Sequence, residues 1–171
     1  MPTESPWNSI QLEEELKTPE NIVRELFLPL KDKTNDKVTF ELHKVNYFPE
    51  EVVIRTENII PSFTTAKEVP HPDFGYEPEI SIERQFFRFR LLLLPTSNKE
   101  IKYEFFKFKY PLLFYPIHVY LNAFLLQFFS EYDVSDNKFI ILKHEKDLYS
   151  FIYKIIRLDS TIQLIKRLMV L

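Results

Sequence analysis

The sequence predicts an α+β fold, with a mainly antiparallel sheet of four or five strands, a long central hairpin at about 79–110 and C-terminal helices packed on the sheet. Residues 79–110 contain two long apolar segments separated by a polar turn. A shorter alternating segment precedes them, and helical patterns dominate the last third of the chain. Strands early and helices late are typical of α+β domains.

The chain organisation follows from its length and its prolines. Residues 1–17 are expected to be an N-terminal arm or short helix, and residues 18–171 fit a single α+β domain. Between residues 61 and 78, four prolines and Gly75 predict a long irregular loop.

The first helix of the domain has clear start and stop signals. Thr18 suits the N-cap, Pro19 the first helical position and Glu20 the first turn, where the helix dipole favours a negative charge. We expect Pro29 to end this helix.

Two strands are expected next. Residues 38–43 alternate Val, Phe and Leu with polar residues, which indicates a half-buried strand. Residues 51–60 favour a second one, although Pro49, Glu50 and Glu51 would also begin a helix.

The hairpin register is inferred from side-chain chemistry. Pairing Leu93 with Ile101 places apolar residues opposite each other and sets Arg90 against Glu104. In this register the side chains that share one face include Phe86, Arg88, Phe106 and Phe108.

Residues 110–130 contain no charged side chain. Pro116 suits a first helical position, and a helical stripe follows at Ile117, Tyr120, Leu121, Phe124, Leu125, Phe128 and Phe129. His118 and Asn122 would then share one helix face. Internal Pro, His, Asn and Gln residues favour a buried core helix over a membrane span, so the protein is not expected to be an integral membrane protein. A strand at 138–142 and helices at 144–158 and after Ser160 complete the prediction.

Composition excludes several kinds of site. With Gly75 as the only glycine, the chain cannot contain a P-loop, a dinucleotide fingerprint or a nucleophile elbow. With no cysteine, it has no disulfide, thiolate nucleophile or Cys-based metal site. No cofactor is expected, and the acidic N-terminus without an apolar core region favours a cytoplasmic protein.

The leading functional hypothesis is a small non-enzymatic protein–protein interaction or regulatory protein. Aromatic residues make up 16% of the chain, and aromatic and arginine side chains commonly anchor interfaces. Trp7, Arg88 and Arg90 are the candidate contacts. The partner is a protein of unknown identity, and a second copy of the chain is one of the options.

Two alternatives come from other classes. The basic, aromatic hairpin at 84–110 could bind single-stranded nucleic acid or RNA, because cations track phosphates while rings stack on bases. Its candidate residues are Arg84, Phe86, Arg88, Phe106, Lys107 and Phe108. A metal-dependent hydrolase is the third reading, in which His71 and Asp73 in the proline-rich loop would be the first two ligands.

Overall fold

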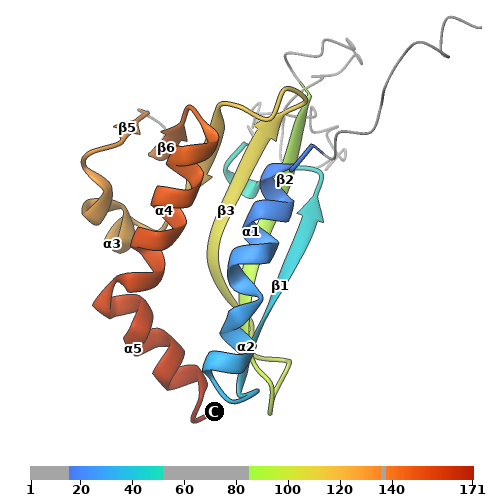
Figure 1. The fold of residues 1–171 in the computed structure, drawn as a ribbon, viewed down its shortest axis with the longest axis vertical. Helices are drawn as coiled ribbons and strands as arrows, with labels where there is room; N and C mark the ends of the chain where they lie inside the picture. Colours follow the sequence, from blue (N-terminus) through green and yellow to red (C-terminus); the bar gives the residue numbers. More distant parts are fainter. Residues whose placement is uncertain (1–15, 52–84, 136–137) are drawn as a thin grey trace, which may run out of the picture.

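A computed structural model describes residues 16–51, 85–135 and 138–171, and it confirms the α+β fold (Figure 1). Within these residues one antiparallel sheet has six strands, more than expected, in the order β1-β2-β3-β4-β6-β5. The predicted features at Trp7, His71, Asp73, Gly75 and Arg84, and most of the expected strand at 51–60, lie outside the described residues. The strands are β1 Val38–Val45, β2 Phe86–Pro95, β3 Tyr103–Pro111, β4 Ile117–Tyr120, β5 Asp133–Val134 and β6 Phe139–Leu142.

The helical elements are short except for those near the two ends of the described chain. They are α1 Pro19–Phe27, α2 Pro29–Lys33, the 3₁₀ turn η2 Pro49–Glu51, α3 Ala123–Leu126, the 3₁₀ turn η4 Gln127–Phe129, α4 Glu145–Arg157 and α5 Asp159–Leu168. Figure 1 shows α1 and α4 over the same face of the sheet, while α5 continues beyond α4 toward α2.

The first helix begins as predicted, with Thr18 extended at the N-cap and Pro19 in the first turn. Pro29 ends α1 but also begins α2, because a proline without an N–H is tolerated in the first turn of a new helix. The buried residues of α1 are Pro19, Ile22, Val23 and Phe27.

The predicted hairpin register is wrong. Leu93 pairs with Tyr103, and a β-bulge then shifts the ladder so that Leu91 pairs with Phe106. The bulge leaves Phe105 as an extra residue, and both Phe105 and Phe106 are buried on the helix side. Strict two-residue alternation cannot bury two consecutive rings on one side, so it led to the wrong pairing.

The single long helix predicted from Pro116 is also wrong. Residues 117–120 form the strand β4, in which Ile117 and Val119 are buried while His118 and Tyr120 point to the opposite face. The helix begins only at Ala123, where the Asn122 side chain accepts a hydrogen bond from the Leu125 N–H at 2.8 Å. His118 and Asn122 therefore do not share a helix face. In the described part of the chain, no helix is long and apolar enough to cross a membrane.

The C-terminal elements agree with the prediction to within a residue or two. The strand is β6, and α4 begins after His144, whose backbone N–H donates to Asp147 Oδ2 at 2.9 Å. The core lies between the sheet and these helices and is rich in aromatic rings. Phe106, for example, meets Phe151 of α4 edge-on, with ring centroids 5.6 Å apart.

Candidate binding site

The two faces of the sheet carry different chemistry. The helix face carries the core residues of the hairpin, including Phe89, Leu91, Phe106 and Phe108. The opposite face, called the outer face here, carries the side chains of Phe86, Arg88, Arg90, Lys107, Lys109, His118 and Tyr120. The sequence-predicted nucleic-acid residues are thus divided, because Phe106 and Phe108 are buried in the core whereas Phe86, Arg88 and Lys107 lie on the outer face.

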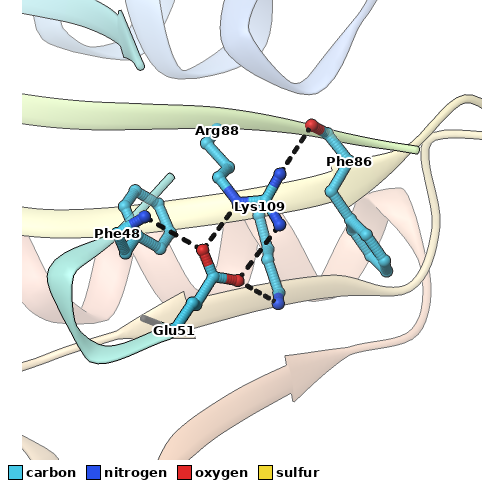
Figure 2. A network of polar contacts seen from close by, with 5 residues as sticks. All are labelled: Phe48, Glu51, Phe86, Arg88 and Lys109. Atoms are coloured by element: carbon cyan, nitrogen blue, oxygen red, sulfur yellow. Dashed lines mark hydrogen bonds and ion pairs between the residues drawn. The ribbon is translucent and has the colours of Figure 1, made fainter. Parts of the chain in front are cut away.

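A buried ionic cluster occupies the centre of the outer face (Figure 2). Glu51 Oε2 accepts from Arg88 Nε at 2.7 Å and from the Phe48 backbone N–H at 3.0 Å. Its Oε1 accepts from Arg88 Nη2 at 3.2 Å and from Lys109 Nζ at 2.5 Å. Arg88 is 1% exposed and also donates from Nη1 to the Phe86 carbonyl at 3.1 Å. One carboxylate therefore links η2 to both strands of the hairpin.

The cluster keeps Glu51 ionised. Burial alone would raise the pKa of this carboxyl, but hydrogen bonds from Arg88 and Lys109 outweigh it and lower the pKa to about 2. Aromatic rings complete the surroundings of the cations: Lys109 Nζ lies 4.8 Å from the centroid of Phe86, and Lys107 Nζ lies 5.4 Å from that of Phe48. Ring faces attract cations, so these contacts stabilise the positive charges.

Arg90, Lys102 and Lys107 of the hairpin are paired with carboxylates as well. Arg90 Nε lies 2.5 Å from Glu104 Oε2, and Lys107 pairs with Glu50. Arg90 and Glu104 do meet, as the sequence suggested, but diagonally and not as direct partners, since Arg90 is opposite Lys107 in the ladder. Glu50 and Glu51 stand far from the hairpin in the sequence, and no local pattern indicated that they would neutralise it.

The residues that the sequence predicted as protein contacts do not form one exposed surface among the described residues. Arg88 is buried in the ionic cluster, Arg90 is partly exposed and paired, and Trp7 lies outside the described residues. Among the residues with a described position, no group of three or more His, Cys, Asp or Glu side chains could hold a metal ion.

The helix face contains two cavities that the sequence did not indicate. The first, the α2–α5 cavity, has a volume of about 430 Å³ and lies between α1, α2, α4 and α5 over the sheet. The second, the α3–α5 cavity, has a volume of about 370 Å³ and is bordered by α3, α5 and the start of β3. Both volumes fall within the range of about 300–1,000 Å³ that is common for ligand pockets.

Helix α5 separates the cavities. Residues Ile162, Ile165, Lys166 and Met169 form one stripe along the helix and line the α2–α5 cavity, whereas Ser160, Gln163, Leu164 and Arg167 form the adjacent stripe and line the α3–α5 cavity. Only Thr161 and Leu168 of this helix are buried. Thr161 and the bulge residue Phe105 border both cavities.

An exposed aromatic pair extends the α3–α5 cavity. Phe124 and Phe128 are 60% and 39% exposed, and their rings meet edge-on with centroids 5.7 Å apart. Phe124 lines the cavity together with Tyr103 and Arg167. We call Phe124, Phe128 and the residues of the α3–α5 cavity the α3 patch. The sequence placed these two phenylalanines in a buried helical stripe, which is why it did not indicate this surface.

When the chain is compared with protein-family models, with curated proteins and with solved structures, none of them matches. The functional argument therefore depends on the geometry of this chain.

Proposed function

We propose that the chain is a non-enzymatic protein-binding or regulatory protein whose partner contacts the α3 patch. The observation that carries the proposal is the exposed pair Phe124 and Phe128 beside a hollow that contains Tyr103 and Arg167. Rings that are left in water beside a concave surface offer apolar area that a partner can bury. Phenylalanine, tyrosine and arginine are also enriched among the anchors of protein interfaces.

Nucleic-acid binding through the hairpin receives less support from the geometry. Arg88, Arg90 and Lys107 each have a carboxylate partner within the chain, so a phosphate would have to displace an existing ion pair. Phe106 and Phe108 are buried in the core and cannot stack on bases. For the metal-dependent hydrolase, His71 and Asp73 lie outside the described residues and add no geometric support.

The test is affinity capture from a nuclease-treated extract of the producing cells. The wild-type chain is compared with Phe124→Ser/Phe128→Ser and with the control Tyr47→Ser, which removes an exposed ring of 54% accessibility away from the patch. A protein that the wild type and the control recover equally, and the double variant does not, supports the proposal.

The recovered protein is then purified and titrated into each variant. Loss of one central aromatic anchor costs about 2 kcal/mol or more, which is roughly a thirtyfold weaker affinity. Equal affinities for the wild type and the double variant would contradict the proposal. A partner recovered from an untreated extract but absent from the nuclease-treated one would contradict it as well.

A further inference from the structure

We propose that the α2–α5 cavity binds a single-chain carboxylate amphiphile, of the fatty-acid class, with its hydrocarbon chain inside and its carboxylate at the rim. This site lies on the other side of α5 from the α3 patch, with which it shares only Phe105 and Thr161, and it takes a different ligand from the protein partner proposed above.

The interior of the cavity suits a hydrocarbon chain. Its floor is formed by Phe27, Leu93 and Phe105, and its walls include Ile156, Ile165 and Met169. A cavity lined by such side chains does not hold water well, because water needs polar partners. Filling it with a hydrocarbon removes apolar surface from water on both the protein and the ligand.

The rim of the cavity carries positive charge only. Lys33 at the end of α2, Arg157 at the end of α4 and Lys166 in the last turn of α5 line it, and no acidic side chain does. None of the three forms an ion pair within the described part of the chain, whereas Arg88, Arg90, Lys107 and Lys109 on the hairpin strands are each paired with a carboxylate. Charges of one sign around an apolar opening attract an opposite charge at the end of an apolar ligand.

The polar groups inside the cavity are not available to bind the carboxylate of the ligand. The Thr34 hydroxyl donates to the Leu30 carbonyl at 2.9 Å and accepts from the Val38 N–H at 3.1 Å, so it is already satisfied. The Thr161 hydroxyl is enclosed and has no hydrogen-bond partner among the described residues, but its oxygen is not exposed to the cavity. A ligand must therefore place its polar end at the rim, where the three cations are.

The experiment is calorimetric titration of the full chain with decanoate and with decan-1-ol, both below the concentration at which they aggregate. We expect one decanoate to bind per chain, with decan-1-ol at least about tenfold weaker because it lacks the charge. Absence of decanoate binding, or equal binding of the alcohol, would overturn the proposal.

Variants locate the site. Lys33→Glu/Lys166→Glu should weaken decanoate binding at least about tenfold, whereas Lys31→Glu/Lys146→Glu, which reverses two exposed charges outside the cavity, should not.

A second pair of variants tests the apolar interior. Ile162→Trp should block the cavity, and Leu113→Trp, at an exposed position outside it, serves as its control. Unchanged binding in both cavity variants, with melting curves that show them folded, would overturn the assignment. None of these variants changes Phe124 or Phe128. A negative result for decanoate binding would therefore not bear on the protein-binding proposal, which is tested by separate variants.

Discussion

The outer face of the hairpin and the helix face beneath α5 differ in how their buried groups are satisfied. On the outer face, Glu51 receives hydrogen bonds from Arg88, Lys109 and the Phe48 backbone, and neighbouring cations have carboxylates of their own. On the helix face, α5 lies between two cavities, and its Ser160 and Thr161 hydroxyls are both buried without a hydrogen-bond partner among the described residues. On the outer face the corresponding unpartnered atom is the uncharged His118 Nδ1, whereas the charged groups there are paired. A conspicuous charged surface can therefore be structural, while the amphipathic helix α5 borders the better candidates for binding.

The largest effect is expected from breaking the ionic cluster. Glu51→Ala removes the carboxylate shared by Arg88 and Lys109 and should lower the free energy of unfolding by about 3–5 kcal/mol, because two enclosed cations lose a partner. Urea denaturation measures the change. Glu50→Ala is the matched control: the Glu50 side chain is 57% exposed, against 10% for Glu51, and without it Lys107 still has Glu104 Oε1 at 3.6 Å, so its loss should cost clearly less. Equal costs would mean that the outer face is not held by Glu51.

Lowering the pH should remove the contribution of Glu51 to the free energy of unfolding. The pKa of Glu51 falls from 4.5 in the unfolded chain to about 2 in the folded one, so its stabilisation is present above pH 4.5 and is lost as the pH falls toward 2. Linkage puts this loss at about 3 kcal/mol. Denaturation at pH 5 and pH 2 should show it in the wild type but not in Glu51→Gln. Burial, with a smaller effect of Lys109, lowers the pKa of His118 to about 4, and the Glu51 charge opposes this slightly. The shift lowers stability in both proteins as the pH falls from 6.5 to 4, so the difference between them reports mainly on Glu51.

Two threonines that line the α2–α5 cavity should respond in opposite directions. Thr161→Val replaces an unpartnered hydroxyl by a methyl group and should raise the free energy of unfolding by about 1 kcal/mol. Thr34→Val removes bonds to Leu30 and Val38 and should lower it by about 1–3 kcal/mol. Thermal and urea denaturation of both variants provides the measurement. Destabilisation by Thr161→Val would show that its hydroxyl is satisfied in solution.

The smallest effect is expected at the edge of the ionic cluster. The side chains of Arg90 and Glu104 are 43% and 33% exposed, so their ion pair should contribute about 0.2–1 kcal/mol. A double-mutant cycle with Arg90→Ala and Glu104→Ala measures this coupling by denaturation. A coupling above about 2 kcal/mol would extend the tightly held part of the outer face to this pair.

The sequence predicted the elements whose signals are local. The start of α1 depends on Thr18 and Pro19, and α4 and α5 depend on helical apolar stripes, all within a few residues of each other. The prediction of one helix over residues 117–129 was wrong because the apolar positions there fit a helical spacing and a short strand equally well. Only the pairing of β4 with β3 and β6 decides between the two.

The candidate sites were less predictable because they depend on contacts that are distant in the sequence. Glu51 meets Arg88 from 37 residues away, so the charge of the hairpin appeared unbalanced when it was counted locally. The two cavities result from the direction that α5 takes after α4, and no local pattern encodes that direction. The exposure of Phe124 likewise follows from α3 being one turn long.

The bulge at Phe105 also makes β3 tolerant of a change in length at one point. Side chains in a strand alternate between faces, so deleting a residue elsewhere in β3 would exchange core and outer positions for the rest of the strand. Deleting Phe105 would not, because the ladder already passes from Glu104 to Phe106 between consecutive residues of β2. Phe106 would still face the core, and Lys107 would still face Glu50. The hairpin can therefore lose one residue here at the cost of a ring in the floor of both cavities, without inverting either face.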